Sequence, residues 1–173
     1  MKTACAISRV VCAVLLAASI GCQRTDSDDK PVADTSADRL SVYEPYMPAR
    51  VEITPLTGFV IPDGAQKPSR IQVYVSVLDS FDCQIKSPGT FRFEMYERAE
   101  RSSEPRGERI VLWPDADLTE AVENNNYWRD FLGAYEFNLN FEPQTNRRYI
   151  LDVTLLCPMG RRLSDDFELE YAK

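Results

Sequence analysis

Apolar and polar side chains alternate strictly through Arg70–Leu78, RIQVYVSVL. Successive side chains of a β-strand point to opposite faces, so this period of two predicts a strand with one buried face. Residues 148–156 and 162–171 are predicted to form a closing hairpin around a Pro-Met-Gly turn at 158–160. Shorter runs of the same kind predict four more strands, at 50–54, 90–96, 109–113 and 135–141.

The pattern becomes helical between the strands predicted at 109–113 and 135–141. Asp117 followed by Glu120 resembles a capping box, and the apolar residues that follow fit one face of a helix. Three asparagines at 124–126 interrupt this run. Aromatic residues spaced by three and four then extend the helical pattern, and Gly133 is the predicted stop. The pattern predicts a short helical insertion near 117–132.

About seven short strands separated by turns predict an all-β fold with antiparallel connections. The spacing and the single insertion favour an immunoglobulin-like antiparallel β-sandwich over residues 41–173. The apolar share of 44% is normal for a globular protein, and the chain of 173 residues is long enough for one domain with its own core.

The segment Met1–Cys22 has a different pattern from the rest of the chain. Lys2 and Arg9 precede a short, almost wholly apolar run, and a polar stretch follows at once, which is the layout of a secretory signal peptide. The ending Ser19-Ile20-Gly21-Cys22 resembles the lipobox of bacterial lipoproteins, in which the cysteine is lipidated and becomes the new N-terminus. The resemblance implies a signal peptide at 1–21 and a lipidated Cys22.

Residues 22–40 continue from that cysteine as a polar, aspartate-rich stretch with hardly any large apolar side chain. Such a segment buries too little surface to order itself, so we expect a flexible acidic tether. Its root-mean-square reach is about 25 Å, which lifts a domain off a membrane surface.

Two cysteines remain in the predicted domain if Cys22 carries lipid, namely Cys83 and Cys157. An oxidising compartment favours joining them in a disulfide. They follow the second and sixth predicted strands, whose loops lie at the same end of an immunoglobulin-like sandwich. Two unrelated buried thiols are the alternative that the sequence leaves open.

The stretch Val77–Phe93, VLDSFDCQIKSPGTFRF, is similar to a recurring segment of bacterial immunoglobulin-like and transthyretin-like repeats. In those repeats a strand ends in Asp, a small turn follows, and a glycine leads into the next alternating strand. The matching positions here are Asp79, Gln84, Ile85, Gly89, Phe91 and Phe93. The resemblance implies a spacer or interaction domain of an exported protein and brings no catalytic residue.

Charge and composition exclude several classes of function. The 27 acidic side chains exceed the 20 basic ones, and the chain has no basic cluster, which argues against nucleic-acid binding. Histidine is absent, so His-based triads and zinc sites are excluded. The sequence contains no phosphate-binding glycine motif, and we expect neither a cofactor nor a catalytic residue. Carboxylate-based hydrolysis is the enzyme class that this composition leaves open.

Tyr127, Trp128 and Phe131 are candidate binding residues. Together they would form an aromatic platform that stacks on sugars or on a protein partner. The alternative is that this stripe packs as core over the open end of the sandwich. Tyr135 lies in the same stripe and would serve instead as a tyrosine corner, with its hydroxyl bonded to backbone.

A set of acidic residues has the ligand type that calcium prefers. Carboxylate oxygens at the ends of a β-sandwich can bind this ion, but the spacing lacks the glycine of an EF-hand loop. A helix N-cap with solvated acids explains the set equally well, and we predict no metal site. The residues concerned are Asp115, Asp117, Glu120, Asp165 and Asp166.

These patterns predict a non-catalytic, lipid-anchored envelope protein that serves as a binding or structural accessory module. The N-terminal lipid would hold it on a bacterial cell membrane or outer membrane, facing the periplasm or the exterior. Its expected partner is a protein or an envelope polymer. The alternatives are a carbohydrate-binding module that uses the aromatic platform and, less favoured, a carboxylate-based hydrolase.

Overall fold

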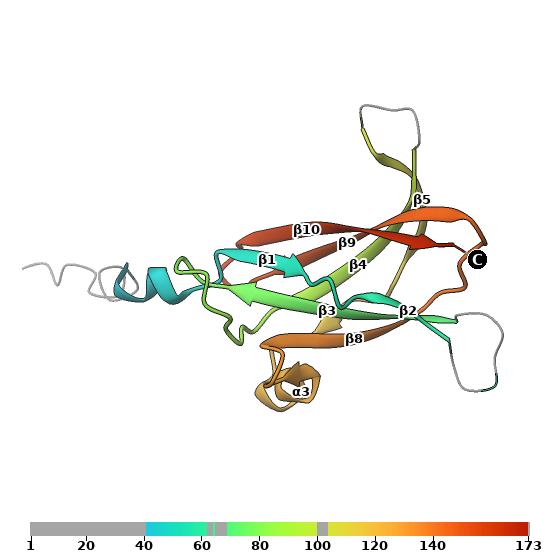
Figure 1. The fold of residues 1–173 in the computed structure, drawn as a ribbon. Helices are drawn as coiled ribbons and strands as arrows, with labels where there is room; N and C mark the ends of the chain where they lie inside the picture. The colour runs from blue at the N-terminus through green and yellow to red at the C-terminus, as the bar shows by residue number, and fades with distance from the viewer. Residues whose placement is uncertain (1–40, 62–63, 65–68, 100–103, 173) are drawn as a thin grey trace, which may run out of the picture. The chain divides into compact units, whose positions relative to one another are not determined.

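The computed structural model of the chain describes residues 41–61, 64, 69–99 and 104–172. The predicted signal peptide (1–21), the lipidation site Cys22 and the predicted tether (22–40) lie outside these residues. The described part is a β-sandwich with a short α-helix at its side and a short helical segment, including the 3₁₀ turn η1 (Glu44–Tyr46), before the first strand (Figure 1). The predicted all-β class is therefore confirmed.

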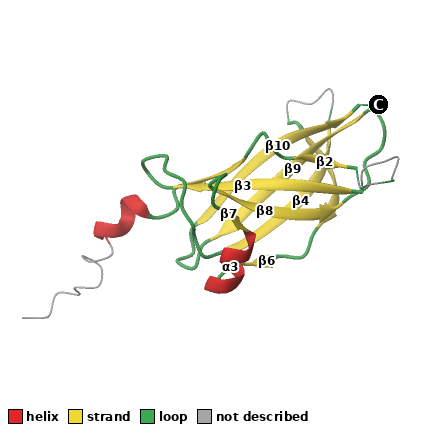
Figure 2. Cartoon of the chain, turned by 60° about the horizontal axis from the view of Figure 1, so that its bottom comes forward, coloured by secondary structure: helices red, strands yellow, loops and turns green. Residues whose placement is uncertain are grey.

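Two five-stranded antiparallel sheets form the sandwich (Figures 1 and 2). The first sheet has the order β1-β3-β8-β7, with β2 also paired to β3. Its strands are β1 (Arg50–Ile53), β2 (Gly58–Val60), β3 (Arg70–Leu78), β7 (Trp128–Arg129) and β8 (Ala134–Asn140). The second sheet has the order β10-β9-β4-β5, with β6 also paired to β4. Its strands are β4 (Thr90–Arg98), β5 (Arg106–Leu112), β6 (Ala116–Asp117), β9 (Arg147–Leu156) and β10 (Arg162–Tyr171).

The seven predicted strands correspond, in chain order, to β1, β3, β4, β5, β8, β9 and β10. One sheet contains the first, second and fifth of them, and the other contains the seventh, sixth, third and fourth. The first and second, third and fourth, and sixth and seventh predicted strands are therefore paired neighbours within one sheet. The other connections cross from one sheet to the opposite one, as in an immunoglobulin-like sandwich. The two- and three-residue strands β2, β6 and β7 were not predicted, because a period of two cannot be recognised over so few residues.

The core lies between the inward faces of β3, β4, β8 and β9. The alternating apolar residues of β3, predicted to face one side, are all fully buried. Phe93 of β4 and Phe137 of β8 meet across the two sheets with ring centroids 4.7 Å apart. Burying these large side chains from both sheets supplies most of the hydrophobic stabilisation of the fold.

The stretch that resembles bacterial repeats forms the end of β3, a tight loop and the start of β4. The Asp79 carboxylate accepts hydrogen bonds from the backbone N–H groups of Phe81 (2.8 Å) and Cys83 (2.9 Å). Gly89 then lies against β9, where a Cβ would come within 2.6 Å of the Leu155 side chain. A short acceptor at the strand end and a glycine before the next strand are therefore required by this loop.

The helix α3 (Ala121–Tyr127) lies within the predicted insertion, but its ends differ from the prediction. Its N-cap is Glu120, with no side-chain capping bond, so the predicted capping box is wrong. The Asp117 carboxylate instead accepts hydrogen bonds from the backbone N–H (3.0 Å) and hydroxyl (2.8 Å) of Thr119. This local turn competes with a helix start at Asp117.

The chain leaves the helix at Trp128 rather than near 132, because Trp128 pairs with Tyr135 as part of β7. The three asparagines, expected to interrupt the helix, lie inside it. Gly133 has a φ of +59° in the turn between β7 and β8, so it serves a strand connection and not a helix stop. Within the described residues no helix is both long and apolar enough to cross a membrane.

Candidate functional site

A groove runs along the open edge of β8. This strand pairs with β3 through most of its length, but on its other side β7 covers only Ala134 and Tyr135. Residues 136–140 therefore have no second strand neighbour in the described part of the chain. The segment between β5 and β6 forms the opposite wall, and the groove, which is open to solvent, has a volume of about 580 Å³.

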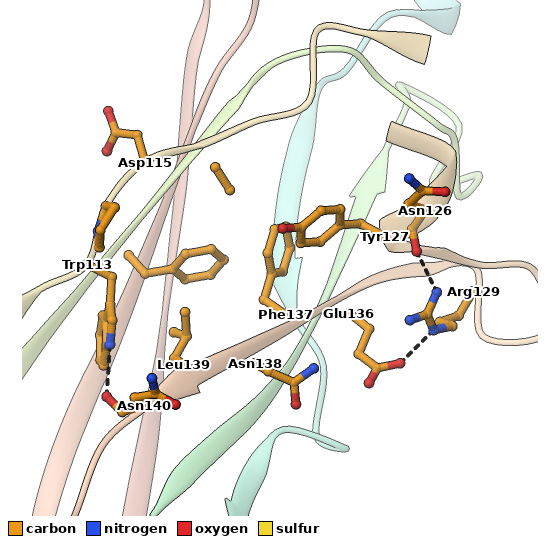
Figure 3. A pocket seen from close by; sticks show the side chains of 13 residues that line it. Trp113, Asp115, Asn126, Tyr127, Arg129, Glu136, Phe137, Asn138, Leu139 and Asn140 are labelled. Atoms are coloured by element: carbon orange, nitrogen blue, oxygen red, sulfur yellow. Dashed lines mark hydrogen bonds and ion pairs between the residues drawn. The ribbon is translucent and has the colours of Figure 1, made fainter. Parts of the chain in front are cut away.

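Aromatic rings flank this groove (Figure 3). At one end Tyr127, the last residue of α3, packs on Phe137 with ring centroids 5.1 Å apart. At the other end the Trp113 indole N–H donates to the backbone carbonyl of Asn140 at 3.0 Å. The inner face of the groove is thus apolar, and Trp113 holds the β5–β6 segment to the far end of β8.

The backbone of β8 also faces the groove. The N–H of Phe141 donates to the carbonyl of Ser69 at 3.0 Å, on the β3 side. Backbone groups of successive strand residues point in opposite directions, so those of Asn140 point away from β3, where its carbonyl meets Trp113. By the same alternation the N–H and C=O groups of Asn138 and Glu136 point toward the groove.

Charged side chains line the groove in pairs. Arg129 of β7 binds Glu136 with an N–O distance of 2.6 Å and also donates to the backbone carbonyl of Asn126 at 2.8 Å. Gln72 donates to the other oxygen of Glu136 at 2.6 Å. Burial raises the pKa of Glu136, but the hydrogen bonds from Gln72 and Arg129 outweigh it, and its pKa is lowered.

Asp115, on the opposite wall, forms a two-pronged pair with Arg92 at 3.0 and 2.8 Å. The hydrogen bond from this guanidinium lowers the pKa of Asp115. Both carboxylates that line the groove therefore stay charged near neutral pH. Exposed amides of Asn138 and Asn140 lie between them along β8.

The three predicted aromatic binding residues do not form one platform. Tyr127 lines the groove, but Trp128 packs on Tyr135 with ring centroids 5.0 Å apart. The Lys86 ammonium lies 5.4 Å from the centre of the Trp128 ring. Phe131 is 85% exposed in the turn between β7 and β8. The helix ends at Tyr127, so the three-and-four spacing no longer aligns these rings.

The predicted role of Tyr135 is only partly correct. Its hydroxyl does bond to backbone, accepting from the N–H of Ser87 at 2.8 Å. Ser87 lies 48 residues upstream in the β3–β4 loop, whereas a tyrosine corner bonds a few residues away. Tyr135 therefore ties two parts of the sandwich together rather than closing a corner.

Other partners occupy most of the acidic residues considered for calcium. Asp115 pairs with Arg92, Asp117 accepts from Thr119, and Glu120 is the N-cap of α3. In β10 the Asp165 carboxylate accepts from the backbone N–H of Ile53 at 2.7 Å, and Asp166 pairs with Arg106 at 3.1 Å. No group of three acidic or cysteine residues in the described ranges is arranged to hold a metal ion.

Cys83 and Cys157 are both free thiols, so the predicted disulfide is not formed in the structure. Their loops do lie at the same end, because Thr90 at the start of β4 pairs with Leu156 at the end of β9. Cys83 is exposed in its loop, whereas Cys157 is half-buried against the hydrophobic core. The sequence predicted correctly that the two loops lie at the same end, but a disulfide also depends on the directions of the two side chains, which the sequence does not give.

Most residues of the groove were not predicted as site residues. Trp113 was predicted only as the end of a strand, and Asn126, Arg129, Asn138 and Asn140 carried no signal of a site. On a single strand, polar residues at alternate positions look like any solvated face. Only the open edge of β8 distinguishes them.

The chain was compared with protein-family models, curated proteins and solved structures. No family model matches it, and no curated protein or solved structure is significantly similar to it.

Proposed function

We propose that the protein is an exported, lipid-anchored, non-catalytic binding module, and that its groove binds saccharide units of an envelope polymer. Export and anchoring rest on the signal pattern of Met1–Cys22. The binding role rests on the groove along β8, a concave site in which aromatic rings and polar groups converge.

The groove has the chemistry that a hydroxyl-rich ligand requires. Sugars present apolar C–H faces that pack on aromatic rings, and hydroxyl groups that both donate and accept hydrogen bonds. Tyr127 offers a partly exposed ring, and the Asn138 amide offers both a donor and an acceptor beside the backbone of the open edge of β8. This combination in one groove is the observation that carries the proposal.

The charges in the groove favour binding over hydrolysis. Glycoside hydrolysis by two carboxyl groups needs one of them protonated near neutral pH, which requires a raised pKa. Glu136 and Asp115 are instead held charged by Arg129 and Arg92, and the pKa of each is lowered. A carboxylate-based hydrolase is therefore not the function that we propose for this groove.

Binding to saccharides isolated from a bacterial envelope tests the proposal. We expect Tyr127→Ala and Asn138→Ala to weaken binding by about tenfold or more, the effect of losing one anchoring contact. The matched control is Phe131→Ala, which removes a neighbouring ring that is 85% exposed and outside the groove. Equal affinity of all three variants and the parent chain would reject the groove as the site.

A second candidate is suggested by the open backbone edge of β8. An extended segment of a protein partner would pair there as an added strand. Asn138→Pro separates the two candidates, because it removes the backbone N–H that an added strand requires. Protease treatment of the envelope fraction abolishes binding only if the partner is a protein, whereas periodate oxidation abolishes it only if the partner is a saccharide.

Anchoring is tested by the intact mass of the mature protein from bacterial membranes. We expect residues 1–21 to be absent and Cys22 to carry more than one acyl chain, as stable anchoring requires. The variant Cys22→Ser should leave the membrane fraction. An unmodified Cys22 thiol in the mature protein would contradict lipid anchoring.

A further inference from the structure

We infer that the end of the sandwich from which the N-terminal segment departs is a membrane-contact surface that rests on the bilayer interface. The inference rests on the proposed lipid anchoring at Cys22. It assigns an orientation to the anchored domain, with one set of loops against the lipid head groups.

Four connections meet at this end, and hydrogen bonds join them. The β3–β4 loop is bonded to the segment before β1, where Ser80 N–H donates to the Pro45 carbonyl at 3.1 Å. The same loop reaches α3, where Lys86 donates to Asn125 at 2.8 Å. The β9–β10 turn is bonded to the segment before β1 through Arg161, which donates to the Pro48 carbonyl at 2.7 Å.

Large apolar side chains are exposed at the tips of these connections and in the β7–β8 turn, whose Gly133 lies against Gln84 of the β3–β4 loop. Two of them, Tyr46 before β1 and Phe81 in the β3–β4 loop, contact each other with ring centroids 5.8 Å apart. Each side chain of this membrane-contact surface is more than 60% exposed. The members are Val42, Tyr43, Tyr46, Phe81, Val122, Phe131 and Met159.

The other exposed large apolar residues of the described chain are fewer and lie elsewhere. Leu56 and Ile61 flank β2, and Ile110 and Leu112 lie on β5. Tyrosine and other amphipathic rings are enriched at the head-group level of a membrane. A group of exposed apolar and aromatic side chains at one end of the domain therefore suits contact with a membrane interface.

The end at which the described chain begins points to the bilayer as the occupant. The described chain begins with the helical segment before β1, which Ser80 and Arg161 bond at this end (Figure 2). Its first described residue is Ser41, and Cys22 is 19 positions earlier in the sequence. If residues 22–40 form the predicted tether, their reach of about 25 Å keeps this end close to the lipid surface. A weak apolar contact is then strengthened, because the bilayer is present at a high effective concentration.

The charges at this end indicate which lipids suit it. Lys86 and Arg161 are already bonded within the protein. Asp130 lies 3.7 Å from Lys86, and Asp82 pairs with Arg50 at 3.1 Å. Among the described residues of this end, the basic side chains are thus matched by acidic ones or by backbone acceptors, which weakens any attraction to anionic head groups. Contact is therefore expected with zwitterionic phosphatidylcholine and should depend little on salt.

The test uses the full lipidated chain in phosphatidylcholine vesicles that contain a nitroxide-bearing lipid. A fluorophore on Cys83, an exposed thiol in the β3–β4 loop, reports proximity to the bilayer. The reference site is Thr145→Cys in a Cys83→Ser background, in the β8–β9 connection at the opposite end. We expect at least about twofold stronger quenching at Cys83, because its loop lies at head-group level.

The triple variant Tyr46→Ser, Phe131→Ser and Met159→Ser should reduce that difference, because only the tether would then hold this end near the bilayer. It should not unfold the domain, because all three side chains are exposed. The matched control, Leu56→Ser, Ile110→Ser and Leu112→Ser, should retain it. Equal quenching at both sites, or no effect of the first triple variant, would overturn the proposed orientation.

Failure of the anchoring itself is recognised separately, because intact mass shows whether Cys22 carries lipid. The unlipidated Cys22→Ser chain tests the surface without the anchor, by flotation with the same vesicles at high lipid concentration. A floating fraction that falls with the first triple variant supports the surface, and no flotation at any lipid concentration argues against it.

Discussion

The hydroxyl of Tyr135 accepts a hydrogen bond from the backbone N–H of Ser87 at 2.8 Å, deep between β8 and the β3–β4 loop. The same hydroxyl lies 3.0 Å from the side-chain oxygen of Asn124 in α3. Asn124 in turn donates to the carbonyls of Ser87 and Leu118, at 2.9 and 3.0 Å. This buried network joins the helix, a strand and a loop, and so positions the helix whose last residue lines the groove.

Replacing Tyr135 with phenylalanine should lower the free energy of unfolding by about 1–3 kcal/mol, because the buried N–H of Ser87 loses its partner. Urea denaturation measures the change. Tyr43→Phe is the matched control, since Tyr43 is 62% exposed and its loss should stay within about 0.5 kcal/mol. Equal stability of the two variants would show that the network contributes nothing.

Gly133→Ala should destabilise the turn between β7 and β8 for two reasons. The φ of +59° costs a non-glycine residue about 1–2 kcal/mol, and a Cβ there would come within 2.0 Å of the Gln84 side-chain oxygen. Gly160→Ala separates the two effects, because its φ is +79° and nothing lies within 4 Å of the added carbon. Thermal denaturation should show the larger loss for Gly133→Ala, and equal losses would mean that Gln84 moves aside without cost.

Asp152 should make stability depend on pH. It lies between Glu94 and Asp166 on the outer face of its sheet. Burial raises its pKa; Arg106, 2.6 Å away, opposes the shift, and the two neighbouring carboxylates add to it. Because the pKa of Asp152 is raised, the folded state binds its proton more tightly than the unfolded chain does, which stabilises the fold at low pH. This contribution is lost as the pH rises from 3.8, the pKa of an ordinary Asp, through the raised pKa of the folded state.

Asp152→Asn should therefore increase the free energy of unfolding at neutral pH relative to the parent chain, and the gain should vanish toward about pH 3. Asp166 remains to pair with Arg106 in this variant. Denaturant titrations across pH measure the effect, with Glu142→Gln as the exposed control. A gain that is constant with pH would show that titration of Asp152 is not its cause.

The two free thiols should differ in reactivity. Cys83 is exposed, whereas Cys157 is half-buried, and burial raises the pKa of Cys157 even though Arg161 opposes the shift. Because the thiolate is the reacting form, an alkylating reagent should modify Cys83 first. Mass spectrometry over time gives the order, and no modification of either residue without a reductant would reveal a disulfide between them.

Many strands of the sandwich are predictable because a strand with one buried face has alternating apolar and polar residues. The predicted bounds 70–78 and 162–171 match β3 and β10, since the residues of each strand alternate between a buried and an exposed face. The helix ends were wrong because Asp117 and Trp128 each have a better local partner than the helix: Thr119 for the first and the edge of β8 for the second.

The sequence by itself determined the strand content, the class of the fold, and the exclusion of histidine-based chemistry. Among the residues that line the groove, the sequence indicated only Tyr127 as a candidate for ligand stacking. Only the tertiary structure decided that β8 is an edge strand, and that Trp113 and Asn140, 27 residues apart, close one end of a groove. A side chain's neighbours along one strand are set by local geometry, whereas a groove between two sheets depends on which distant segments meet.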